Sequence, residues 1–173
     1  MIFSNDTELT LRAACVLVNS DRADGERLAD LGALDAYLDS FGWTGRRDGD
    51  AAELRSVHRL RKRLGELWAL AGDEEQVVEA VNALLSDTKA SPWLTRHPEM
   101  PEWHLHLASR EDPLWQRMGA EMAMALANTP TTALVWPRPF CDEDDRGQYA
   151  ERHGAAGLGA PYPLCYYVRV SQS

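Results

Sequence analysis

Apolar residues in the first half of the chain recur every three or four positions, which is the spacing of an amphipathic helix. Four such stretches lie between residues 7 and 86, and each follows a residue that can cap a helix. The pattern predicts helices over residues 7–19, 31–41, 51–71 and 74–86. We expect the last two to form an antiparallel hairpin, because the connection between them is very short.

The period changes to two between residues 91 and 108, which is typical of β-strands. Trp103 and Leu105 alternate there with His104 and His106. Two prolines lie in the segment between the two alternating runs, and proline cannot donate to a strand ladder. We therefore expect a β-hairpin whose turn is bounded by these prolines.

A fifth helix is predicted after Asp112, with Pro113 at its first position, and it ends before Thr129. The periodicity is lost beyond residue 130, and only residues 164–170 resemble a further strand. The predicted fold class is mainly α with a small antiparallel β-hairpin. We expect one helical domain over residues 1–130 and an irregular tail over residues 131–173.

Composition narrows the functional classes. The chain has 173 residues and a formal net charge of −9, so DNA binding by this chain alone is disfavoured. Cys15, Cys141 and Cys165 are too few and too widely spaced for a disulfide framework, which favours a reducing cytoplasm. The first residues lack the pattern of a signal peptide, and no apolar run is long enough for a membrane span.

Four stretches of the sequence are distinctive in their order and spacing: Leu11-Arg12-Ala13-Ala14 with Val16-Leu17-Val18-Asn19, Ala52-Glu53-Leu54-Arg55, Val81-Asn82-Ala83-Leu84-Leu85 and Trp103-His104-Leu105-His106. Together they resemble the ABATE-domain family of stress-induced transcription regulators. The resemblance covers about residues 5–130 and implies a cytoplasmic regulatory domain that senses a small molecule. The family also carries a C-terminal Cys-Gly-Asn-Arg zinc finger.

The tail departs from this family pattern, because no Cys-Gly-Asn-Arg string occurs. Cys141, His153 and Cys165 could supply zinc ligands, but they would leave one position of a tetrahedral site open. Residues 138–173 also hold four arginines against five acidic residues, whereas DNA contact needs an excess of positive charge. The sequence therefore predicts an eroded finger, with zinc as the one conceivable cofactor.

Two opposed interpretations fit the histidines of the predicted hairpin. His104 and His106 project from one face of a strand, and His97 from the partner strand would complete a metal triad for a metal-dependent enzyme. The simpler interpretation is a polar strand face opposite Trp103 and Leu105. No nucleophile motif, phosphate-binding loop or zinc-protease string accompanies them, so we do not expect an enzyme.

A small-molecule site is expected in a cleft between the hairpin and the long helix that follows Asp50. Such a cleft would be apolar on one side and charged on the other, which suits an anionic or amphipathic ligand, whether in a regulator or in a stand-alone binding protein. The predicted lining residues are Arg55, His58, Trp68, Arg96, Trp103, His104 and His106.

Two further sets of residues, one on the long helix and one in the tail, also have an interpretation. The basic residues at helical spacing from Arg55 to Arg63 are also typical of a solvated helix face. The apolar tail residues Tyr166, Tyr167 and Val168 would be covered if the chain formed a homodimer.

Overall fold

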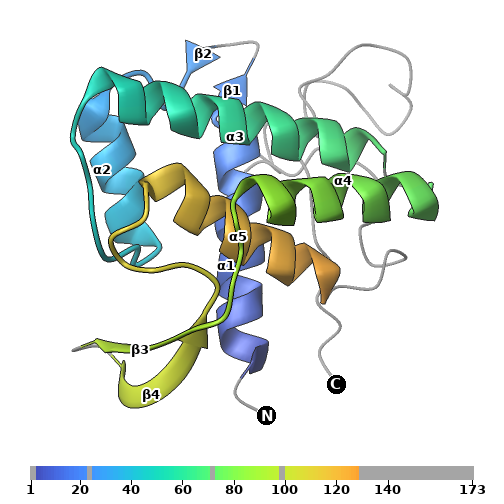
Figure 1. The fold of residues 1–173 in the computed structure, drawn as a ribbon. Coiled ribbons are helices and arrows are strands. Elements are labelled where there is room, and N and C mark those ends of the chain that lie inside the picture. The colour runs from blue at the N-terminus through green and yellow to red at the C-terminus, as the bar shows by residue number, and fades with distance from the viewer. Residues whose placement is uncertain (1–2, 23–24, 71–72, 98–99, 129–173) are drawn as a thin grey trace, which may run out of the picture.

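The computed structural model describes residues 3–22, 25–70, 73–97 and 100–128 (Figure 1). These residues form five helices and two small antiparallel sheets, so the predicted mainly α fold with a β-hairpin is confirmed. The helices are α1 (Phe3–Val18), α2 (Leu31–Ser40), α3 (Ala51–Ala69), α4 (Glu74–Asp87) and α5 (Leu114–Ala127). The strands are β1 (Asp21–Arg22), β2 (Gly25–Glu26), β3 (Trp93–His97) and β4 (Met100–His106).

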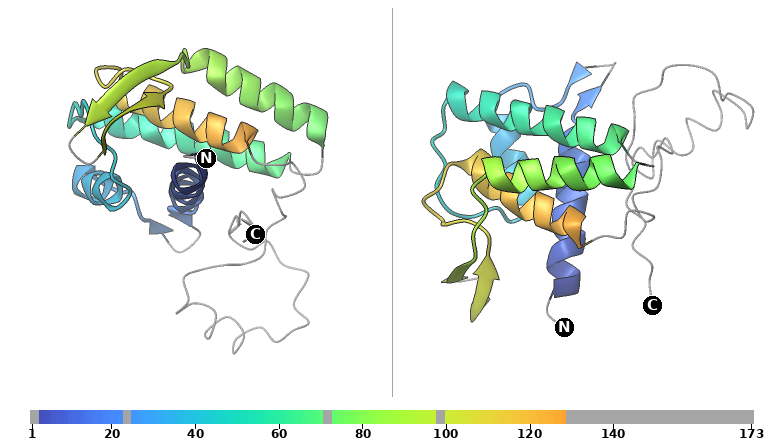
Figure 2. Two further views of the ribbon diagram at one scale, coloured as in Figure 1. Left: turned by 90° about the horizontal axis from the view of Figure 1, so that it is seen from below. Right: turned by 45° about the vertical axis from the view of Figure 1, so that its right-hand side comes forward.

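Helix α5 lies at the centre of the helical body and packs against α1, α3 and α4 (Figure 1). Its buried face is built from small and flexible side chains such as Met118, Met122 and Ala123. Gly119 allows α4 to approach closely, because a Cβ there would lie 2.7 Å from Cγ2 of Thr88. Helices α3 and α4 run antiparallel, as predicted, and the hairpin of β3 and β4 lies on the other side of α5 from α3 (Figures 1 and 2).

Three aspartates cap the helices as predicted, because each side chain accepts N–H groups that have no partner inside the helix. Asp30 accepts from Ala33, and Asp73 accepts from Gln76. Asp50 accepts from the first turn of α3, where Glu53 in turn accepts from the main-chain N–H groups of residues 48 and 49. This reciprocal arrangement fixes the loop between α2 and α3, which forms one wall of the site described below.

Four local predictions were wrong. Helix α1 begins at Phe3, four residues before its predicted start at residue 7. The polar link after α1, for which no strand was predicted, contains the two-residue pairing of β1 with β2. Pro101 lies inside β4 instead of bounding it, which is tolerated because every strand of a two-stranded sheet is an edge strand. Helix α5 begins at Leu114 with Pro113 as its N-cap, whereas Pro113 was predicted to be the first residue of the helix. The predicted helix stop at Gly72 and the strand over residues 164–170 lie outside the described residues.

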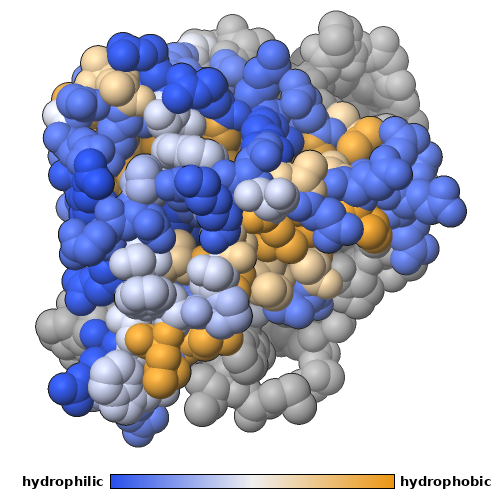
Figure 3. Space-filling model, viewed as in Figure 1, coloured by the Kyte–Doolittle hydropathy of each residue, from blue (hydrophilic) through white to orange (hydrophobic). Residues whose placement is uncertain are grey.

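The β-hairpin turns its polar face toward the helices. Leu94 and Trp103 are each 62% exposed and Leu105 is 46% exposed, whereas Thr95 on the opposite face is buried. Figure 3 shows the resulting apolar patch over the hairpin. Apolar alternation alone would place the leucines against the core, so we infer that the polar face is selected by its partners within the helical body.

None of the described helices combines the length and apolarity that a membrane crossing needs.

Candidate functional site

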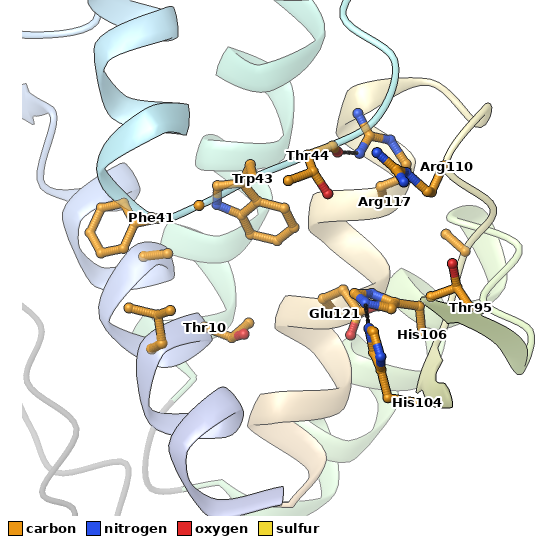
Figure 4. Close-up of a pocket in the computed structure, with 14 residues that line it drawn as sticks. Thr10, Phe41, Trp43, Thr44, Thr95, His104, His106, Arg110, Arg117 and Glu121 are labelled. Atoms are coloured by element: carbon orange, nitrogen blue, oxygen red, sulfur yellow. Dashed lines mark hydrogen bonds and ion pairs between the residues drawn. The ribbon is translucent and has the colours of Figure 1, made fainter. Parts of the chain in front are cut away.

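A cavity of about 190 Å³ lies between α1, the loop after α2, the β-hairpin and α5 (Figure 4). It brings together segments from both ends of the described chain. Its lining residues are Leu9, Thr10, Ala13, Phe41, Gly42, Trp43, Thr44, Thr95, His104, His106, Ala108, Arg110, Arg117 and Glu121.

One wall of the cavity is apolar and aromatic. Phe41 and Trp43 reach it from the end of α2, and Ala13 reaches it from α1 (Figure 4). The hydroxyl of Tyr37 donates to the carbonyl oxygen of Ala13 at 2.9 Å and ties the two helices together. The indole Nε1 of Trp43 is buried and has no hydrogen-bond partner among the described residues. This wall can pack against a flat or aliphatic ligand body.

Arg117 forms the opposite end of the cavity and is only 6% exposed. Its guanidinium donates to three main-chain carbonyl oxygens, those of Thr44, Arg46 and Asp112. Burial lowers the pKa of Arg117, and the charge of Glu53 opposes that effect. Arginine stays protonated in proteins, so a positive charge is fixed at this end of the cavity.

The loop that holds Arg117 depends on Gly45. A Cβ at this position would lie 2.7 Å from Nη1 of Arg117 and 2.9 Å from the carbonyl oxygen of Arg110. The residue also has a φ of +92°, a conformation that side chains disfavour. Glycine is therefore required here both for its backbone conformation and for the close approach of the loop to the arginine.

Arg110 lines the same cavity as Arg117, and its positive charge lowers the pKa of Arg117. Arg110 is exposed. Among the residues the structure describes, no carboxylate lies within ion-pair distance of either arginine. The carboxylates of Glu53 and Asp112 raise the pKa of Arg117 through their charge. This end of the cavity is therefore electropositive in a chain of net charge −9.

A hydrogen-bonded chain of two histidines and a carboxylate lines the remaining side (Figure 4). Nε2 of His104 lies 3.0 Å from Nε2 of His106. Nδ1 of His106 lies 3.0 Å from Oε1 of Glu121, which also accepts the main-chain N–H of Leu107 at 2.9 Å. The side chains of His106 and Glu121 are 34% and 23% exposed, so the pair is half-buried at the edge of the cavity.

These hydrogen bonds connect the hairpin to α5. Nδ1 of His104 donates to the carbonyl oxygen of Glu102 at 2.8 Å, because a carbonyl oxygen can only accept. The Nε2 atoms of the two histidines share a hydrogen bond, and Nδ1 of His106 faces the carboxylate of Glu121. This geometry explains why the polar face of the hairpin is turned inward.

The structure places two of the seven predicted ligand-binding residues at this cavity, His104 and His106. The cavity is not between the hairpin and the long helix, because α5 lies between those two elements (Figures 1 and 2). The other five predicted residues do not line it.

Each of those five residues has a different environment. Arg55 is exposed on α3, and His58 donates to the carbonyl oxygen of Leu28 at 2.9 Å. Trp68 is buried in the core at 4% exposure. Arg96 lies 5.0 Å from the ring centre of Trp103 on the outer face of the hairpin. Their arrangement gives no common binding surface.

Metal binding finds no geometric support in the described residues. No group of three or more His, Cys, Asp or Glu side chains within residues 3–22, 25–70, 73–97 and 100–128 is arranged to hold a metal ion. The side chain of His97 is not among those described, and Cys141, His153 and Cys165 lie outside the described residues.

Twelve of the fourteen lining residues were missed from the sequence, among them the aromatic and charged residues Trp43, Arg110, Arg117 and Glu121. A signal for two of these four exists, since Arg117 and Glu121 are the only charged residues of α5 and are spaced to share one helix face. No comparable signal marks Trp43 or Arg110, which lie in loops and enter the cavity only through the tertiary fold.

No curated protein matches the chain. The model of the ABATE family, described as "Putative stress-induced transcription regulator", matches residues 11–138. That match spans well over half of the chain and includes every residue that lines the cavity except Leu9 and Thr10. The chain belongs to the ABATE family.

Proposed function

We propose that the protein is a small-molecule-sensing domain of a transcription regulator and that the cavity beside α5 is its sensing site. The observation that carries the proposal is the contrast between the two sides of this cavity. An aromatic wall at Trp43 faces fixed charges at Arg117 and Glu121. Small-molecule sites typically combine an apolar lining with a few polar groups that point toward the ligand.

The position of α5 would allow ligand binding at the cavity to affect the C-terminal residues. Arg117 and Glu121 reach the cavity from this helix, which packs against α1, α3 and α4. The helix ends at Ala127, and the C-terminal residues follow it directly. A ligand that displaces either charged side chain therefore acts on the element that leads into the tail. We assign sensing to this domain and no catalytic role.

The test is a fragment screen by NMR on the full chain, with uncharged, anionic and cationic compounds in separate pools. The probe signal is the indole N–H resonance of Trp43, assigned by its loss in Trp43→Phe. We expect at least one pool to shift this resonance in a saturable manner. The proposal is wrong if no pool shifts it while the spectrum is that of a folded protein.

A matched variant localises the response. Glu121→Gln removes the charge that Nδ1 of His106 faces and should change the affinity for any compound that shifts Trp43. Glu66→Gln is the control, because Glu66 is an exposed residue of α3 that pairs with Lys62 at 3.8 Å and does not line the cavity. An equal response of both variants would place the binding elsewhere.

A further inference from the structure

We propose that the ligand of this cavity is a small monocarboxylate with an apolar body, whose carboxylate binds Arg110 beside Arg117. This inference rests on the proposed function and names the class of compound that the site takes.

The charge balance of the lining indicates an anion. Two arginines and one carboxylate, that of Glu121, line the cavity. Glu121 already bonds His106 on the other side of the cavity, at 3.0 Å. The two guanidinium groups at the other end have no carboxylate within ion-pair distance among the described residues. An anionic ligand would supply the missing charge.

The number of carboxylates follows from the donors that remain at this end. The guanidinium of Arg117 already donates to the main-chain carbonyl oxygens of Thr44, Arg46 and Asp112. Arg110 is exposed at the cavity, with no side-chain hydrogen bond to another described residue. Of the two guanidinium groups, that of Arg110 is therefore the one with donors left for a ligand. A single carboxylate fits it, because the guanidinium fork presents two parallel N–H groups to a carboxylate.

The size and the remaining wall define the rest of the ligand. The cavity of about 190 Å³ lies below the range of roughly 300–1,000 Å³ that holds drug-sized molecules. Phe41, Trp43, Leu9 and Ala13 leave an apolar surface for the part of the ligand that points away from the arginines. An aromatic ring and a short alkyl chain both satisfy this surface, and the experiment separates them.

The experiment titrates the full chain with benzoate, hexanoate, benzamide and acetate by isothermal titration calorimetry and by the Trp43 indole resonance. We expect benzoate or hexanoate to bind, with the stronger of the two identifying an aryl or alkyl body. Benzamide has the shape of benzoate without its charge and should bind at least about 10-fold more weakly, since a charge-assisted hydrogen bond is lost. Acetate lacks the apolar body and should also bind more weakly.

Two arginine variants test the position of the carboxylate. Arg110→Gln should weaken carboxylate binding at least about 10-fold. Arg59→Gln should leave it unchanged, because Arg59 is an exposed residue of α3 whose Nη2 donates to Ser56 at 2.9 Å, away from the cavity. Equal weakening in both variants, or none in Arg110→Gln, would overturn the assignment.

The outcomes also separate this inference from the proposed function. If neutral or cationic compounds shift the Trp43 resonance and neither carboxylate does, the carboxylate assignment is wrong and the sensing site stands. If no compound of any charge shifts it, both are wrong.

Discussion

Arg117 on α5 donates to the main-chain carbonyl oxygen of Thr44, so that a buried side chain of the last helix holds the loop that follows α2. The same guanidinium also bonds the carbonyl oxygens of Arg46 and Asp112. A single cation thus joins α5, the residue before its N-cap and the loop that carries Trp43. We infer that the shape of the cavity and the stability of the domain depend on the same hydrogen bonds.

Replacing Arg117 with lysine should therefore destabilise the fold. A lysine keeps the charge but cannot present donors to three separate carbonyl oxygens in the plane of a guanidinium. We expect Arg117→Lys to lower the free energy of unfolding by about 2–3 kcal/mol, the range for hydrogen bonds to charged groups. Urea denaturation measures this loss. Arg110→Lys is the control, since Arg110 is exposed and should change stability by less than about 0.5 kcal/mol.

Gly45 and Gly49 form a second matched pair within the same loop. Both have a positive φ, of +92° and +65°, but only at Gly45 would a Cβ meet other atoms. Gly49→Ala should cost about 1 kcal/mol for the left-handed backbone alone. Gly45→Ala should cost at least about 1 kcal/mol more, because Arg117 or the main chain of Arg110 must move. Similar losses in the two variants would show that the loop gives way without strain.

Most of the fold could be predicted from local pattern. The three aspartate caps satisfy N–H groups within three residues of themselves, and the apolar stripes of α3 and α4 have helical spacing. Such interactions are local, so the sequence around them contains the information. The end of α2 is also locally determined, because Gly42 follows it with a φ of +65°, the left-handed conformation that glycine favours at helix C-termini.

The site could not be predicted in the same way, because its contacts join distant segments. Thr44 and Arg117 are separated by 73 residues, and nothing near either one indicates the other. The orientation of the hairpin also depends on a distant group, since Glu121 on α5 draws His106 inward. Local alternation distinguishes the two faces of a strand but does not determine which one a tertiary partner selects.

This orientation of the hairpin gives a direct test with two leucines. Leu94 is 62% exposed on the outer face of β3, whereas Leu64 of α3 is fully buried. We expect Leu94→Thr to change the free energy of unfolding by less than about 0.5 kcal/mol and Leu64→Ala to lower it by about 2–5 kcal/mol. A large loss in Leu94→Thr would mean that the apolar face of the hairpin is covered in solution, which light scattering would detect as a change of mass.

The free energy of unfolding should fall at acid pH because of the ion pair between Glu26 of β2 and Arg61 of α3. The two carboxylate oxygens of Glu26 accept from the two terminal nitrogens of Arg61 at 2.7 Å each. The side chain of Arg61 is only 9% exposed, while that of Glu26 is 33% exposed. Hydrogen bonding to Arg61 lowers the pKa of Glu26 below its ordinary value of 4.5.

A lowered pKa in the folded state means that folding favours the ionised carboxylate. The stabilisation is therefore complete above pH 4.5 and is lost as the pH falls through the lower folded-state pKa of Glu26. We expect Glu26→Gln to lower the free energy of unfolding by about 2 kcal/mol at pH 7, less than the 3–5 kcal/mol of a fully buried pair because Glu26 is partly exposed. Urea denaturation at pH 7, 5 and 4 should show the wild-type advantage shrinking only below pH 4.5. Glu66→Gln should have little effect at any pH, because its pair with Lys62 is exposed. A Glu26→Gln deficit that stays constant down to pH values that protonate Glu26 would show that the side chain contributes through packing and not through its charge.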